Sequence, residues 1–234
     1  MKKNPDGLMP YHAIVNIIIM RECATVEEAI ETAKSYDWSQ QYRGTIDGQF
    51  MLADATGDAV VISADSTGEI VFTRKPRGDG FLVSTNFNRA RPENRYGTYP
   101  CERYDAAVRM LGEIESESDL TVEYLASTLD AVHAEGRKLN TLYSNIFDLK
   151  KGVAYIYYWH RFDDPVVLDV AEVIARRPEP VRISTLFPAE AVEQAESEYR
   201  SYRRRPFFIV AAGAVLTAGA IAFIVYRRSW KTPI

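Results

Sequence analysis

The chain has 234 residues, of which 47% are hydrophobic and 26% are charged, a composition typical of an ordinary globular protein. Outside one long apolar stretch, about 200 residues remain, enough for one domain or two small ones whose core needs no disulfide or metal. The net charge of −4 argues against nucleic acid as the main partner.

Cysteines and histidines are few and scattered. The two cysteines are Cys23 and Cys101, and the three histidines are His12, His133 and His160. Because no CxxC or HxxxH spacing occurs, neither a disulfide framework nor a zinc motif is indicated. We therefore predict no structural metal and no cofactor. The first residues, MKKNPDGLMPYH, lack the apolar stretch of a secretory signal peptide.

The first half of the chain predicts helices and then a strand meander. Residues 10–36 predict two helices, an Ile-rich buried one and a second that opens at a capping box formed by Thr25 and Glu28. Short antiparallel strands with tight glycine turns follow. In chain order these are 49–63, which turns at Gly57, then 69–73 and 81–87, before an irregular loop at 88–100.

The second half repeats this order of helices and strands. Helices are predicted over 103–114 and 121–136, the second with Gly136 as its C-cap. A tyrosine-rich hairpin is predicted over 139–162, turning at 150–152, and a short strand and helix over 165–176. Helices and strands in this arrangement predict an α+β fold.

The apolar stretch, Pro206 to Tyr226, predicts a transmembrane helix. It contains no charged residue, and about 20 helical residues span the roughly 30 Å hydrocarbon layer of a bilayer. Basic residues flank both ends in nearly equal number, four before and three after, so the sequence does not fix which side of the membrane the preceding domain faces. The alternative, a buried core helix, rarely runs this far without a polar face.

Several segments together resemble a known family. These are ADATGDAVVIS, LVSTNF, YPCERYDAAVRML and LYSNIFDLKKGVAYIYYWHRFDDP, with TVEEAI upstream of the first strand. In order and spacing they are similar to the C-terminal half of the N-terminal-nucleophile (Ntn) hydrolases related to choloylglycine hydrolase and isopenicillin N acyltransferase. The resemblance covers residues 10 to 170. It implies part of a four-layer αββα sandwich that cleaves the carbon–nitrogen bond of linear amides.

The resemblance implies two site residues. Asn86 matches the family asparagine whose amide stabilises the oxyanion, and Arg103 matches the family arginine near the nucleophile. Without the resemblance, Asn86 would be a turn former at a strand end, and Arg103 a solvated charge in the first turn of a helix.

The nucleophile of the family has no counterpart among the 234 residues. In the family, a cysteine freed by self-cleavage attacks the amide, and its own α-amino group, whose pKa lies near 8, acts as base. Cys23 is expected to be a small buried residue, and Cys101 is not expected to be catalytic. Asp54, Asp58 and Asp105 are expected to cap turns and helices.

The predicted organisation has one soluble domain and one anchor. The segments are an N-terminal tail, the Ntn-like domain, a charged helical linker, the transmembrane helix and a tail, at residues 1–9, 10–186, 187–205, 206–226 and 227–234. Two functions remain open. One is a membrane-anchored linear-amide hydrolase or acyltransferase domain that lacks its nucleophile half and either acts only with a separately encoded N-terminal half or is an inactive remnant. The bared sheet face of such a half favours that partner or a homo-oligomer. The other is a non-enzymatic, membrane-tethered binding or scaffold domain.

Overall fold

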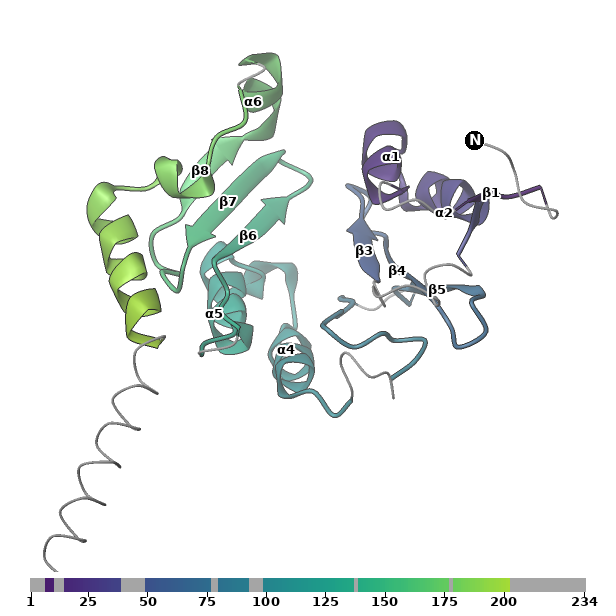
Figure 1. Cartoon of the computed structure of the whole chain (residues 1–234), viewed down its shortest axis with the longest axis horizontal. Helices are drawn as coiled ribbons and strands as arrows, with labels where there is room; N and C mark the ends of the chain where they lie inside the picture. The colour runs from purple at the N-terminus through teal and green to yellow at the C-terminus, as the bar shows by residue number, and fades with distance from the viewer. Residues whose placement is uncertain are drawn as a thin grey trace, which may run out of the picture.

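The computed structural model describes residues 7–10, 15–38, 49–76, 80–92, 99–136, 139–176 and 179–202. Their secondary structure is α+β, as predicted, with helices beside two three-stranded antiparallel sheets (Figure 1). None of the described helices is long and apolar enough to cross a membrane, and the predicted anchor at 206–226 lies outside the described residues.

The first sheet, in the order β3–β4–β5, is packed against two helices. The elements of this part are α1 (Val15–Glu22), α2 (Val26–Lys34), β3 (Phe50–Ala53), β4 (Ala59–Ala64) and β5 (Ile70–Arg74), with a parallel pair of two-residue strands, β1 (Met9–Pro10) and β2 (Tyr36–Asp37). One face of β4, with Val60 and Ile62 fully buried, packs with Val15 and Ile19 of α1 and Val26 of α2. All of β4 is buried, and because its side chains point alternately to the two faces, Val60 and Ile62 lie on the face that carries the helical layer.

The turns and caps of this part follow the sequence. Gly57 and Gly68 adopt φ values of 86° and 90°, which glycine accommodates without strain. Thr25 forms the predicted capping box with Glu28. Asp54 Oδ2 also accepts a hydrogen bond of 2.8 Å from the backbone N–H of Val26, so the β3–β4 turn is tied to the start of α2.

Two expectations for this part are wrong. The Ile-rich helix is not wholly buried, because Ile17 and Met20 on its outer face are 60% and 71% exposed. A two-turn helix lying on a sheet can bury only one face. Residues 81–87 form no strand, since they join no backbone ladder among the described residues. The side chain of Gln49 bonds this segment instead, donating to Thr85 O at 2.9 Å and Phe87 O at 2.6 Å.

The second sheet, in the order β6–β7–β8, has helices on either side. The elements of this part are α4 (Glu102–Gly112), α5 (Val122–Val132), β6 (Tyr143–Asp148), β7 (Val153–Tyr158), β8 (Val166–Asp169) and α6 (Val170–Arg176), two short 3-10 turns (Glu117–Asp119 and Ile183–Leu186) and a helix over 189–202. The hairpin turns at the predicted place, with Gly152 at φ 68°. The helix over 189–202 packs through Ala195 and Tyr202 against Trp159.

Helix α5 ends earlier than the sequence suggested. It stops at Val132, and His133 is extended, so Gly136 is not its C-cap. The helix ends here because side chains further along the chain accept hydrogen bonds from the next backbone N–H groups. Thr141 Oγ1 accepts from Ala134 N at 2.8 Å, and Asn140 Oδ1 accepts from Gly136 N at 2.9 Å. The chain therefore leaves the helix axis at His133.

Candidate functional site

Asn86 sits on a segment that is fixed on both sides. Before and after it, the backbone is bonded to Gln49, whose Oε1 also accepts from Arg89 N at 3.1 Å. Two residues on, the buried side chain of Asn88 donates to Ala64 O at the end of β4 at 3.0 Å. The Asn86 side chain itself is exposed. These hydrogen bonds fix the backbone on both sides of Asn86 and so keep its side chain at the surface.

Arg103 lies in the first turn of α4, and aromatic rings hold that turn beside the Asn86 segment. Phe87 meets Tyr99 and Tyr104 edge to face, with ring centroids 5.6 Å and 5.2 Å apart. Such pairs contribute about 0.5–1.5 kcal/mol each beyond their buried area. The α4 N-terminus is thereby brought next to the residue before Phe87.

The structure brings the two predicted site residues into direct contact. Nη2 of Arg103 donates a hydrogen bond of 2.7 Å to Oδ1 of Asn86. A guanidinium can only donate, so the atom facing it must be the amide oxygen. The amide Nδ2 is consequently turned away from Arg103, and among the described residues it has no acceptor in hydrogen-bond range.

Cys101 adjoins this pair. Its Sγ lies 3.6 Å from Asn86 Oδ1 and 3.6 Å from Thr85 Oγ1. Cys101 is the N-cap residue of α4, but its side chain caps no backbone N–H. Its hydrogen bonds among the described residues include none to a histidine or carboxylate, so no general base for the thiol is in place. Cys23 is half-buried beside Thr32, 3.3 Å from its hydroxyl.

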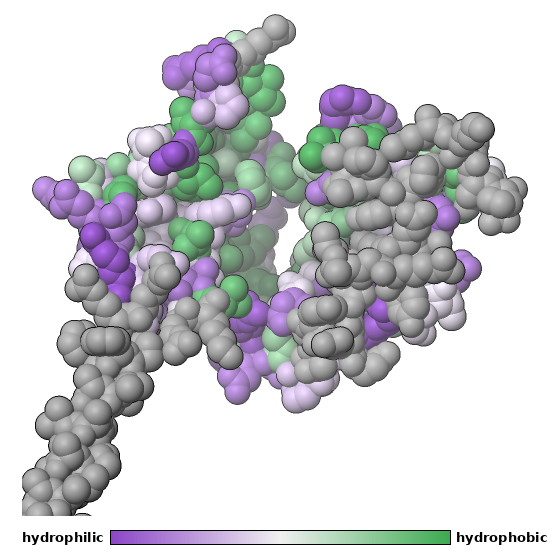
Figure 2. Space-filling view, viewed as in Figure 1, coloured by the Kyte–Doolittle hydropathy of each residue, from purple (hydrophilic) through white to green (hydrophobic). Residues whose placement is uncertain are grey.

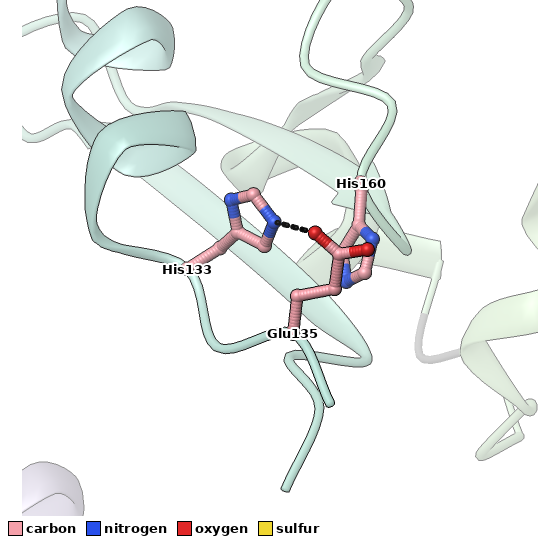
Figure 3. A group of neighbouring side chains, drawn as sticks. All are labelled: His133, Glu135 and His160. Carbon is pink, nitrogen blue, oxygen red and sulfur yellow. Dashed lines mark ion pairs between the residues drawn. The ribbon is translucent and has the colours of Figure 1, made fainter. Parts of the chain in front are cut away.

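A second cluster, which the sequence did not reveal, joins His133, Glu135 and His160. One potential ligand atom from each lies within 4.8 Å of the other two. His133 directly follows α5, and His160 comes two residues after β7, so the packing of α5 against the sheet brings them together (Figure 3). The three residues are separated by 2 and then 25 positions, which matches no common metal-binding motif. They lie together because α5 ends at Val132.

The protonation of this histidine-carboxylate cluster follows from its contacts. His133 Nδ1 lies 2.5 Å from Asp130 O, a backbone acceptor, so Nδ1 carries the proton. His133 Nε2 lies 3.8 Å from Glu135 Oε2. Burial lowers the pKa of His160, and positive charge on the neighbouring His133 lowers this pKa further. Nε2 of His160 is buried and has no hydrogen-bond partner among the described residues.

The helix over 189–202 makes hydrogen bonds to Glu135 and to Trp159, which is next to His160. The hydroxyl of Tyr202 donates to Oε1 of Glu135, the oxygen of that carboxylate that does not face His133. Trp159, which stacks on His160 at 4.5 Å between ring centroids, donates from Nε1 to Glu198 at 2.6 Å. Trp159 has a φ of 56°, unusual for a bulky residue, and this conformation turns the chain directly before His160.

Comparisons of the chain with models of protein families, with curated proteins and with solved structures find no match.

Proposed function

We propose that residues 10–186 form one half of an Ntn-type αββα sandwich, tethered by the helix at 206–226, that cleaves N-acyl amides once a second polypeptide segment supplies the cysteine nucleophile. The observation that carries the proposal is the 2.7 Å contact between Arg103 and Asn86, with Cys101 beside it. The resemblance of the sequence names these two residues independently of the structure, and the packing of Phe87 on Tyr99 and Tyr104 brings them together.

The geometry suits an oxyanion donor. Because Arg103 fixes the amide oxygen of Asn86, the amide N–H2 group is held as a donor pointing away from the guanidinium. A preorganised donor of this kind lowers the barrier of acyl transfer by about 3 kcal/mol. A charge-assisted bond of this length also limits the rotation of the Asn86 side chain.

The proposed reaction has two steps. The supplied thiol passes its proton to the cysteine's own α-amino group and adds to the amide carbonyl carbon, and the carbonyl oxygen becomes the oxyanion at Asn86. The carbon–nitrogen bond then breaks, and the amine leaves with that proton from the α-ammonium group. Water then adds to the resulting thioester and releases the carboxylic acid and the thiol. In an acyltransferase an acceptor amine takes the place of this water.

Residues without a strand partner and exposed apolar side chains support the proposal that a further polypeptide segment covers the sheets. Residues 81–85 have no regular secondary structure and no ladder partner among the described residues, and Ser84 Oγ accepts from Gln49 Nε2 at 3.0 Å. Apolar side chains of the sheets are also uncovered: Met51 on β3 is 42% exposed, and Tyr143 and Phe147 on the edge strand β6 are 52% and 56% exposed. Figure 2 shows apolar surface over the β6–β7–β8 sheet. Exposed apolar strands of this kind favour cover by a further segment or a second copy.

The same uncovered strands favour the alternative, a membrane-tethered binding domain without catalysis. In that case the Asn86–Arg103 pair is a structural contact between a loop and a helix. The two functions differ in one measurable respect, the dependence of amide hydrolysis on Asn86.

The test uses native membranes. We would replace the chromosomal copy in the natural host with the wild type, with Asn86→Ala, or with nothing, and measure amine release from N-acyl p-nitroanilides of different acyl length. The proposal expects Asn86→Ala to lower kcat by about 10²–10³-fold with little change in KM. Arg109→Ala, which changes an exposed arginine on the same helix, is the matched control and should leave the rate unchanged. Equal rates in all strains would favour the binding domain.

A further inference from the structure

We propose that His133, Glu135 and His160 form a binding site for one divalent transition-metal ion, with Zn²⁺ as the preferred ion. The site lies in the second part of the fold, on residues that the proposed amide chemistry does not use. Two imidazoles and one carboxylate form a donor set that suits Zn²⁺ and leaves a coordination position open.

The distances are close to those of a bound state. Zn²⁺ binds histidine nitrogen and carboxylate oxygen at about 2.0–2.2 Å, so neighbouring ligand atoms in a tetrahedral site lie about 3.3–3.6 Å apart. His133 Nε2 and Glu135 Oε2 are 3.8 Å apart, and all three ligand atoms lie within 4.8 Å of one another. Small side-chain rotations, each about 1 Å or less at the ligand atom, would close the set around an ion.

The contacts of His133 prepare it as a ligand. Its Nδ1–H is committed to Asp130 O, so Nε2 is the ring nitrogen that faces Glu135 Oε2, and in the tautomer with its one proton on Nδ1 it can bind a cation. Metal-bound histidines usually donate their other ring N–H to a backbone carbonyl or carboxylate in this manner.

His160 supplies an independent indication. Its Nε2 is buried, and no described group bonds to it. Buried polar atoms without a partner are rare in folded proteins, and coordination would give this nitrogen one. Glu135, across from it, is held in place through its other oxygen by the hydroxyl of Tyr202.

The surroundings attract a cation. A cavity of about 570 Å³ adjoins the cluster and is lined in part by His160 and Asp130. Two further carboxylates, Glu123 and Asp163, line it, and no lysine or arginine among the described residues does. A cleft lined by one sign of charge concentrates ions of the opposite sign.

The ion would fasten the helix over 189–202 to the second sheet. Tyr202 contacts Glu135, and Glu198 contacts Trp159 beside His160, so this helix supports two of the three proposed ligands, while Asp130 of α5 supports His133. Binding at the cluster therefore stabilises the docking of the helix that leads to the predicted anchor.

The test is titration of the full-length chain, purified in detergent without an affinity tag, with ZnCl₂ against a chromogenic chelator. We expect one Zn²⁺ per chain with a Kd of about 1 μM or tighter, and much weaker binding of Mg²⁺ and Ca²⁺. His133→Ala and His160→Ala should each weaken binding by more than about 100-fold, and Tyr202→Phe by about tenfold. Glu172→Gln, which changes an exposed carboxylate on α6, is the control and should bind as the wild type does.

X-ray absorption at the zinc edge identifies the ligands in the wild-type chain itself, so it does not depend on variants that fold correctly. The proposal expects nitrogen and oxygen ligands at about 2.0–2.2 Å, with the outer scattering of two imidazoles. A sulfur ligand at about 2.3 Å would assign the ion to Cys23 or Cys101 and overturn the proposal. Absence of stoichiometric binding, or binding that survives His133→Ala combined with His160→Ala, would overturn it as well.

Discussion

Arg103 donates to the side-chain oxygen of Asn86 at 2.7 Å, across 17 residues of sequence. The contact joins the N-terminal turn of α4 to a loop that is bonded to Gln49 and to β4. Since the guanidinium accepts no hydrogen bond, it orients the Asn86 amide with its N–H2 group outward.

Removal of Arg103 should disturb activity through Asn86. A hydrogen bond to a charged group contributes about 1.5–3 kcal/mol, so Arg103→Ala should lower kcat by about 10–100-fold, and Arg103→Lys by less. The measurement is amine release in native membranes, with KM determined in parallel. A rise in KM at unchanged kcat would show that Arg103 binds substrate and does not position Asn86.

Cys101 should be dispensable. No described histidine or carboxylate bonds its thiol, so the purified chain alone should give no burst of amine from an N-acyl p-nitroanilide. Cys101→Ala should retain the activity measured in native membranes. If the purified chain shows a burst that Cys101→Ala abolishes, the nucleophile resides in this chain and our account of the chemistry is wrong.

The carboxylate of Asp54 should stabilise the first part of the fold. It accepts hydrogen bonds from Thr56 and from the first turn of α2, so Asp54→Ala should lower the free energy of unfolding by about 1–2 kcal/mol. Urea denaturation of the full-length chain in detergent measures this loss. Asp164→Ala, which removes an exposed carboxylate 3.4 Å from Arg161, is the control, with an expected change below about 0.5 kcal/mol.

The Asp54 contribution should also depend on pH. Burial acts to raise the pKa of Asp54, but hydrogen bonds from Thr56, Val26 and Asp58 together outweigh it and lower the pKa below the ordinary value. A lowered folded-state pKa means that the stabilisation is complete above the unfolded pKa of about 3.9 and is lost as the pH falls through the folded pKa. The difference between wild type and Asp54→Ala should therefore be constant from pH 7 to pH 5 and narrow below pH 4. A constant difference down to pH 2 would refute this assignment.

The proposed anchor predicts that the full-length chain resists extraction from membranes by carbonate. Deletion of residues 203–234 should release the protein while leaving Tyr202 and its contact with Glu135 in place. Cell fractionation with immunoblotting measures both. A full-length chain that stays in solution without detergent would rule out the anchor.

Local signals in the sequence predicted local structure well. The capping box at Thr25 and the turns at Gly57, Gly68 and Gly152 rest on backbone chemistry within a few residues, and each is found. The strand at 81–87 was not found, because a strand depends on a ladder partner, and the Gln49 side chain takes that place.

The two sites differ in how far they could be predicted. The resemblance named Asn86 and Arg103 as site residues, and they lie in contact, but the resemblance gave no sign that the Asn86 side chain is exposed. The cluster of His133, Glu135 and His160 had no spacing signal. It depends on α5 ending at Val132, which side chains of Asn140 and Thr141 decide from the next segment. Hydrogen bonds of this kind, from backbone N–H groups to side chains four and seven residues further on, leave no periodic pattern in the sequence.

The most direct test of the central claim is the location of the acyl group during turnover. Native membranes would be quenched in acid during hydrolysis of an N-acyl p-nitroanilide, and the thioester mapped by mass spectrometry. The account predicts an acyl thioester on a cysteine that is the first residue of its polypeptide, copurifying with this chain and strongly reduced in Asn86→Ala. An acyl group on Cys101 or Cys23, or an N-terminal thioester that accumulates equally without Asn86, would contradict it.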